Sequence, residues 1–357
     1  MIEKFKDLDW ILIGGIFILA IASLTSLAST DIDFFWRQLT WFILAFIFIF
    51  LGSQINWRSL ISQDWFRLGV YFLSVLFLLI SNFQSGTVRG TKAWLSFGDF
   101  NFEPSELAKL ALIFVLANFF SKRYLGAWLS KNIIVSLIYA FIPVLLVAIQ
   151  PDLGSAFVIL SIWLGFLLLG GVNYKRLIIG FLLVILIFGI LWSFYLKSYQ
   201  KERFLGFFSP TSDPLGVNYN VIQSKIAIGS AGLLGKGFKA GTQTQLHFLP
   251  EAQTDFLFAA FVEEWGILGG VVILLTFLIV VLRILNIGLR ARTNDFKFIA
   301  LGTSLILVVH FLINMGSNLG FLPVAGLPFP FLSYGGSSLL TLAALMGIIQ
   351  YIKIESR

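Results

Sequence analysis

The stretch WILIGGIFILAIASLTSLAS at residues 10–29 contains no ionisable side chain and is long enough to cross a bilayer as one helix. Lys4 and Lys6 precede it, as in a secretory signal, but its apolar length exceeds a normal signal core, so we interpret it as a retained helix. The sequence therefore predicts an all-α integral membrane protein, a single polytopic domain over 1–357 with about ten transmembrane helices. The nine other apolar runs lie near 35–54, 66–83, 105–121, 132–149, 153–171, 175–196, 256–282, 298–319 and 337–353.

The composition agrees with lipid as the main solvent of this chain. Hydrophobic residues make up 58% of the sequence and charged residues only 12%, which is too few for the surface of a water-soluble particle. Cysteine is absent, which excludes disulfides, thiolate metal sites and a cysteine nucleophile. The two histidines, His247 and His310, lie far apart in the sequence, so a histidine-rich zinc or haem site is not expected.

Lysine and arginine are distributed unequally between the two sides of a ten-helix topology. The ratio is about fifteen to four, which predicts that both termini lie in the cytoplasm. The net charge of +7 mostly reflects this asymmetry and gives no reason to expect a nucleic-acid partner. The richer side holds Lys4, Lys6, Arg58, Arg67, Lys122, Arg123, Lys131, Lys175, Arg176, Arg283, Arg290, Arg292, Lys297, Lys353 and Arg357; the other holds Arg37, Arg89, Lys92 and Lys109.

The segment 197–255, between the seventh and eighth predicted helices, is the longest one outside the membrane and is predicted to be extracytoplasmic. Its apolar residues and its glycines predict short amphipathic helices and ordered turns packed on the outer membrane face. Its basic residues could meet anionic headgroups or a phosphorylated substrate, or only extend to the interface as lysines commonly do. These residues are Lys197, Lys201, Arg203, Lys225, Lys236 and Lys239.

Ionisable groups within apolar helices are costly and normally face a polar cavity. Glu106 and Lys109, in FEPSELAKLAL (102–112), stand three residues apart on one helical face and could form an ion pair lining such a cavity. Part of this segment also has a structural explanation, because Ser105 could cap the helix and Glu106 favours its positive N-terminal dipole. Lys109 is poorly explained in that way, which favours a functional pair.

Three further acidic positions have both structural and functional interpretations. Asp152, in AIQPDLGSAF (148–157), lies between two closely spaced helices and could be a functional carboxylate or only an N-cap. Glu263 and Glu264 lie about one turn inside the eighth predicted helix, where they could pair with neighbouring helices or line the same cavity. The sequence does not choose between these alternatives.

Asp255 ends the long segment in LHFLPEAQTDFLFAAFVEEWG (246–266), where the chain re-enters the membrane. A carboxylate at such a boundary could cap a helix, act as a general base, or coordinate a hard divalent cation together with a pyrophosphate ligand. No Walker loop or dinucleotide fingerprint is present to carry nucleotide chemistry.

Four separated stretches resemble the SEDS family, named for shape, elongation, division and sporulation. They occur in the family's order along nearly the whole chain, and the variant GKGFKAGTQTQLHFLPE resembles the elongation branch more than the division branch. Two small departures are Trp265 in place of the usual leucine and Phe102-Glu103 in place of a glutamine-containing approach to the PSE motif. The stretches are GTKAWLSFGDFNFEPSELAKLAL (90–112), QPDLGSA (150–156), IGSAGLLGKGFKAGTQTQLHFLPEAQTDFLFAAFVEEWG (228–266) and NMGSNLGFLPVAGLPFPFLSYGGSS (314–338).

The resemblance implies a glycosyltransferase of the bacterial cytoplasmic membrane, which polymerises lipid II into glycan strands of peptidoglycan during elongation. It also implies that Asp255 is the essential aspartate and that Glu106, Lys109 and Asp152 match residues of the central cavity. A bound divalent cation, Mg²⁺ or Mn²⁺, and basic side chains are expected to stabilise the departing pyrophosphate; Lys109 is the strongest basic candidate, and Arg89 and Lys92 are weaker ones. Alternatives are a lipid II flippase, for which no broken inverted-repeat helices are evident, and a noncatalytic scaffold.

A partner is also expected, because the chain has no Ser-x-x-Lys motif in its outer segment to crosslink peptides. The resemblance implies a class B penicillin-binding protein. Its membrane helix is predicted to dock against the lipid-facing side of residues 270–320, where glycines permit close approach. These glycines are Gly269, Gly270, Gly302, Gly316 and Gly320.

Overall fold

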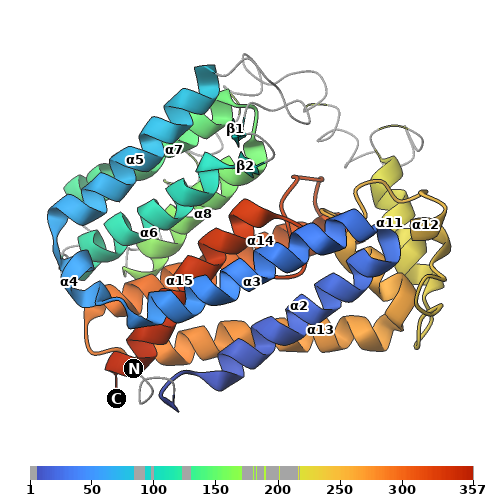
Figure 1. The fold of residues 1–357 in the computed structure, drawn as a ribbon. Helices are drawn as coiled ribbons and strands as arrows, with labels where there is room; N and C mark the ends of the chain where they lie inside the picture. Colours follow the sequence, from blue (N-terminus) through green and yellow to red (C-terminus); the bar gives the residue numbers. More distant parts are fainter. Residues whose placement is uncertain are drawn as a thin grey trace.

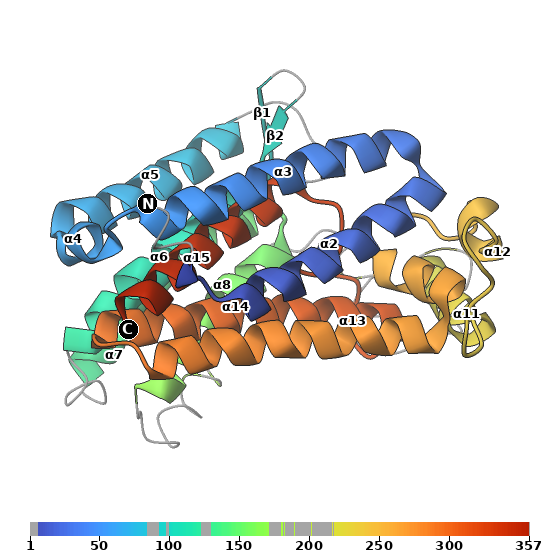
Figure 2. The same cartoon turned by 60° about the horizontal axis from the view of Figure 1, so that its bottom comes forward.

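The computed structural model describes residues 6–83, 93–97, 100–122, 130–170 and 218–356, and the isolated positions 180, 182, 189, 201 and 216. Within them the chain forms a bundle of long helices with one two-stranded antiparallel hairpin (Figures 1 and 2). The elements are α2 (Trp10–Thr30), α3 (Ile32–Gln54), α4 (Trp57–Ser62), α5 (Asp64–Phe83), β1 (Leu95–Phe97), β2 (Phe100–Phe102), α6 (Pro104–Lys122), α7 (Ser130–Ile149), α8 (Leu153–Leu169), α11 (Tyr219–Ser230), α12 (Thr242–Gln245), α13 (Leu257–Leu289), α14 (Asn294–Leu319) and α15 (Gly336–Glu355).

Eight of the described helices are long and apolar enough to cross a membrane, which confirms the predicted fold class. They are α2, α3, α5, α6, α7, α13, α14 and α15. Helix α8 is apolar but shorter, with 17 residues. The predicted span at 175–196 lies outside the described residues except for the isolated positions 180, 182 and 189. The short helix α4 and the hairpin, which pairs Leu95 with Phe102, were not anticipated.

One end of the bundle holds both chain termini and many of the basic residues assigned to the richer side (Figure 1). Polar contacts between distant segments tie this end together, and the hairpin, α11 and α12 lie toward the opposite end. The predicted grouping of Arg58, Lys122, Arg283 and Lys353 at one end is therefore correct. The contacts join Asp9 to Arg283 and Gln350, Arg58 to Glu355, Lys122 to Asp64, and Asp295 to Asn118 and Ser121.

Two close helix contacts hold the interior together. Helices α3 and α15 cross at Gly52 and Gly347, where a Cβ atom on Gly52 would lie 3.0 Å from the Cα atom of Gly347. Only glycine lets two backbones approach so closely. On the other side of the bundle, Phe120, Phe166 and Phe298 join α6, α8 and α14, with the rings of Phe166 and Phe298 stacked 5.9 Å apart.

Most of the glycines expected on the lipid-facing partner surface pack inside the protein instead, so that part of the prediction was wrong. Gly302 is buried, and a Cβ atom there would lie 3.0 Å from Ile113 and Phe166. Gly316 is also buried, against Leu322. These small residues allow α14 to pack on α6, α8 and the loop that follows it.

Helix α13 is broken at Gly266, whose backbone (φ 76°, ψ 177°) is not helical. The break interrupts the intrahelical hydrogen bonds, and the segment 232–237 replaces them with its own backbone. Lys236 N and Gly237 N donate to the carbonyl oxygens of Glu263 and Glu264, each at 3.0 Å. In return, the amides of residues 267 and 268 donate to the carbonyl oxygens of residues 232 and 233. The outer segment is thus joined to α13 through the main chain.

Candidate functional site

Asp255 lies in the turn immediately before α13, at the end of the bundle opposite the termini (Figure 1). Asp255 is partly exposed, whereas Phe256 beside it is fully buried. The backbone carbonyl oxygen of Asp255 accepts hydrogen bonds from the side-chain amides of Asn314 and Asn318, both at 2.9 Å. These bonds fix the main chain at the Asp255 turn.

The two asparagines belong to a polar stripe on α14. His310, Asn314 and Asn318 follow one another at intervals of four residues, so they lie on one face of the helix. All three are buried. Asn314 also donates to the carbonyl oxygen of Leu327 at 2.8 Å, which holds the loop after α14 against the same face. The stripe therefore connects the Asp255 turn to the interior of the bundle.

Glu106 and Lys109 form the predicted ion pair, with 2.9 Å between Glu106 Oε1 and Lys109 Nζ. The Lys109 side chain is 0% exposed and that of Glu106 2%. Lys109 Nζ also lies 3.4 Å from His310 Nε2. An ammonium group only donates, so His310 Nε2 must accept, which assigns the ring proton to Nδ1. Glu106 Oε2 is buried and has no hydrogen-bond partner among the described residues.

Glu103 extends this cluster toward the outer end. Its Oε1 accepts from Ser105 Oγ at 2.5 Å and from Ser155 Oγ at 3.2 Å. Ser105 lies inside α6, which begins at Pro104, so the expectation that Ser105 caps the helix was wrong. Asp152 does cap α8, accepting from Ser155 N at 3.0 Å. The structural interpretation of Asp152 is therefore correct, and Ser155 brings it close to Glu103.

The loop between α14 and α15 lies between Asp255 and the start of α8. A Cβ atom on Gly326 would lie 4.0 Å from Asp255 Oδ2. Next to it, the carbonyl oxygen of Ala325 packs so closely on Gly154 that a side chain there would collide with it. The structure thus brings the predicted carboxylates to one end of the bundle through this shared loop. Arg89 and Lys92 lie outside the described residues.

Glu263 and Glu264 pair with neighbouring segments, which is one of the two alternatives left open by the sequence. Glu264 accepts from Ser29 Oγ at the end of α2. Glu263 forms an ion pair with Lys236, with 2.8 Å between Oε1 and Nζ. Neither carboxylate contacts the Glu106 and Lys109 pair by any hydrogen bond that the described residues contain.

The described residues do not contain a group of three histidine, aspartate or glutamate side chains able to hold a metal ion. The described side chains alone therefore do not provide the ligands of a resident metal site. A cation beside Asp255 would need most of its ligands from a bound molecule.

Comparisons with known proteins decide the family of the chain. Residues 6–357 match the family of cell cycle proteins that comprises FtsW, RodA and SpoVE. The chain belongs to the SEDS family. Its fold agrees, because a chain from a solved peptidoglycan synthase complex that coordinates polymerization and crosslinking superposes with a TM-score of 0.83. That chain is 29% identical, and the match covers 98% of each protein.

Two curated relatives of this SEDS protein are both peptidoglycan glycosyltransferases by name. MrdB of Escherichia coli (strain K12), which is RodA-like, is 38% identical over 92% of this chain and 87% of the relative. The probable glycosyltransferase FtsW of Haemophilus influenzae is 34% identical over 90% and 81%. The higher identity to MrdB agrees with the interpretation that the motifs resemble the elongation branch.

Several polar residues of this SEDS protein's site were missed by sequence reasoning. His310 was considered only as a metal ligand, and Asn314 and Asn318 were not considered at all. Their spacing of four residues within an apolar helix was a visible signal, because polar side chains are costly there and tend to share one face. Glu103 was noted only as a departure from the family pattern. Its partner Ser155 had no signal in the sequence.

The buried carboxyl group of Glu103 predicts that the stability of the folded protein depends on pH. Burial and the charge of Glu106, opposed by Lys109 and reinforced by Asp152, raise the pKa of Glu103 to about 7 from 4.5. The folded protein therefore favours the protonated carboxyl, so its ionisation costs stability as pH rises from about 4.5 to 7. Glu103→Gln should stabilise the SEDS protein above pH 7, by at most ~3 kcal/mol, and should have no such effect near pH 4.5.

Thermal unfolding of the purified protein in detergent at several pH values would measure this difference. Glutamine retains an acceptor for Ser105 and Ser155, so the hydrogen bonds are a matched background. A stabilisation of the same size at pH 5 and pH 8 would contradict the assignment of the titrating group to Glu103.

Proposed function

We propose that this SEDS protein is a peptidoglycan glycosyltransferase that polymerises lipid II into glycan strands at the outer face of the bacterial cytoplasmic membrane. The observation that carries the proposal is the 38% identity to MrdB over 92% of the chain, together with the family match over 6–357. The site supports it, because Asp255 and the buried polar cluster lie at the same end of the bundle.

Glycosyl transfer from a lipid pyrophosphate needs a base for the acceptor 4-hydroxyl group. The acceptor oxygen forms the new bond to the anomeric carbon, the bond to the pyrophosphate breaks, and the proton passes to the base. Asp255 suits this role because the residue is partly exposed while its main chain is fixed by two asparagine side chains. A fixed backbone holds the base in the geometry that the reaction requires.

Lys109 is not suited to bind the pyrophosphate of the substrate. Its ammonium group is fully buried and bound to Glu106 and His310, so it is not accessible to a large charged substrate. We assign the pair to the packing of α6 against α14, because Lys109 on α6 lies 3.4 Å from His310 on α14. Glu106 Oε2 is buried as well and has no donor among the described residues. Arg89 and Lys92 remain the candidates for stabilising the pyrophosphate leaving group.

The proposal is tested by supplying purified lipid II to the purified protein in detergent, alone and with a class B penicillin-binding protein. Glycan strands should form, as separated by gel electrophoresis of the products. Detergent micelles have no inside or outside, so a flippase would give no product in this assay. Absence of strands with a folded complex would overturn the proposed function.

Glycan strands also have to be crosslinked, and we propose a class B penicillin-binding protein as the partner. The similarity to a chain of a complex that coordinates polymerization and crosslinking supports this. With Gly302 and Gly316 buried, the candidate surface within 270–320 is the exposed apolar side of α13. That side is formed by Val271, Val272, Leu275, Leu278, Ile279 and Leu282.

Tryptophan substitutions on this surface provide a prediction. Val272→Trp with Leu275→Trp should weaken the complex with the class B protein by about tenfold, equivalent to about 1.4 kcal/mol, because bulky rings separate the helices. Leu76→Trp on α5 is the control, since Leu76 is 51% exposed, against 55% and 54% for the two α13 positions. Co-purification measures the outcome. This surface would be excluded if the Leu76→Trp control weakened the complex as much as the α13 substitutions, or if no substitution weakened it.

The chain is a multi-pass bacterial membrane protein, and we propose that its termini face the cytoplasm. The grouping of basic residues at the end that holds both termini supports this orientation. Asp255 and the segment 218–255 then face the outside, where polymerisation of lipid II takes place.

A further inference from the structure

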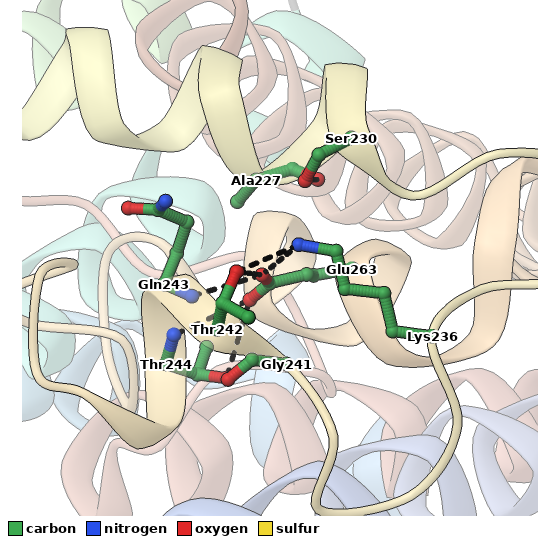
Figure 3. Close-up of polar contacts among 8 residues, drawn as sticks. All are labelled: Ala227, Ser230, Lys236, Gly241, Thr242, Gln243, Thr244 and Glu263. Carbon is green, nitrogen blue, oxygen red and sulfur yellow. Dashed lines mark hydrogen bonds and ion pairs between the residues drawn. The ribbon is translucent and has the colours of Figure 1, made fainter.

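Glu263 is the most heavily bonded carboxylate of the described residues and is not used by the chemistry above. Its side chain is 0% exposed and lies within α13 (Figure 3). Oε1 accepts from Lys236 Nζ at 2.8 Å, Gln243 N at 2.9 Å and Thr242 Oγ1 at 3.2 Å. Oε2 accepts from Thr244 N at 3.3 Å and Thr244 Oγ1 at 3.2 Å. One buried carboxylate thus binds four residues of the outer segment. We call Glu263 together with these four residues the clamp.

The clamp fits a junction that is already rigid in its main chain. The break of α13 at Gly266 is filled by the backbone of residues 232–237, as described above. A side chain at Gly235 or Gly266 would collide with the opposing main chain, so the two segments lie in direct contact. Lys236 therefore reaches Glu263 from a backbone that is itself attached to α13.

The chain between the clamp and Asp255 is strained. His247 (φ 56°) and Glu251 (φ 55°) adopt left-handed backbone conformations that residues other than glycine rarely occupy. Such conformations persist only where the surroundings hold them. The strained segment is held at one end by the clamp, at Thr244, and at the other by the asparagine side chains that bind the Asp255 carbonyl oxygen.

We propose that Glu263 is a positioning residue for Asp255, acting through the strained segment 244–255. The inference rests on the proposed function, because Asp255 needs a fixed position only if its carboxylate is the base. Losing the clamp would weaken the hold on one end of the segment, where Gln245 also donates to Ser29, and let His247 and Glu251 relax toward ordinary backbone conformations. The carboxylate of Asp255 would then spend less time in the reactive geometry, although no atom of Glu263 touches the substrate.

The expected effect is on turnover more than on substrate binding. Misplacing a reacting group by about 1 Å can cost about a hundredfold in rate, so Glu263→Gln should lower kcat by about ten- to a hundredfold with little change in the KM for lipid II. Lys236→Met should lower kcat less, because the uncharged donors of the clamp stay in place. Lys236→Arg retains the positive charge and should restore most of the activity.

A matched control separates positioning from general loss of stability. Asp9 at the opposite end of the bundle is also a buried carboxylate paired with a partly exposed base, Arg283. The exposed fractions are 1% and 29% for that pair and 0% and 23% for Glu263 and Lys236. Asp9→Asn should lower the unfolding temperature comparably to Glu263→Gln and leave kcat near the wild-type value.

Hydrogen–deuterium exchange gives a second measurement that does not depend on activity. In Glu263→Gln, or in Lys236→Met if the first variant fails to fold, exchange should rise at the amides of residues 241–256. Exchange in the inner half of α13, at residues 270–289, should not change. In Asp9→Asn the amides of 241–256 should exchange as in the wild type.

The outcomes distinguish this inference from the proposed function. A wild-type protein that polymerises lipid II, together with clamp variants of unchanged kcat and exchange, would overturn the positioning role alone. Equal losses of kcat in Glu263→Gln and Asp9→Asn, in proportion to lost stability, would also overturn it. A wild-type complex that makes no strands would overturn the proposed function and, with it, the role assigned to Glu263.

Discussion

Asp255→Asn is expected to abolish glycan polymerisation while leaving the protein folded in the membrane. Asparagine has nearly the same size as aspartate, but its neutral amide cannot accept the proton of the acceptor hydroxyl group. Loss of a general base commonly costs a factor of about 10² to 10⁴ in rate. The fold should survive, because Asn314 and Asn318 bind the backbone carbonyl oxygen of residue 255, which the substitution retains.

The measurement is strand synthesis from lipid II by wild type and variant in complex with the partner, with thermal unfolding as the check on folding. Asp33→Asn is a suitable control, since Asp33 is an exposed carboxylate in the first turn of α3. It should retain most activity. Near-normal synthesis by a well-folded Asp255→Asn protein would remove Asp255 from the mechanism.

Lys109→Met is expected to destabilise the protein strongly and to reduce polymerisation with it. The substitution leaves the buried Glu106 carboxylate without its cation, and Glu106 Oε2 has no donor among the described residues. Removing one member of a buried ion pair typically costs about 3–5 kcal/mol. Glu106→Gln should be similarly impaired, because its amide oxygen can still accept from Lys109 but the negative charge that compensates the buried ammonium group is lost.

The double variant Glu106→Gln with Lys109→Met tests whether the two residues act as a unit. Its loss of stability should be smaller than the sum of the single losses, because neither charge then stays buried alone. Arg58→Met is the control: Arg58 pairs with Glu355 at the surface with 62% exposure, and such pairs contribute about 1 kcal/mol or less. A stable and active Lys109→Met protein would reduce the pair to a feature of the helix end.

The sequence by itself determined the class of fold and the end of the protein at which to look. A helix crossing lipid must be apolar over about 20 consecutive residues, and this requirement is local, so it can be read without knowing any neighbour. The same local rule made Glu106, Lys109 and Asp255 conspicuous, because ionisable residues in or beside such helices need a special reason. The family motifs then gave these residues a common context.

Only the tertiary structure decided which side chains meet. Lys109 and His310 are 201 positions apart, and Glu263 binds a segment about 20 residues before it, so neither pairing has a sequence period to reveal it. Helices that are apolar on all sides also hide which face is inside. The glycine at 302 looked as suitable for a partner as any other, yet it packs on Phe166. In lipid, packing of small residues and polar contacts choose the neighbours, and that choice depends on shape in three dimensions.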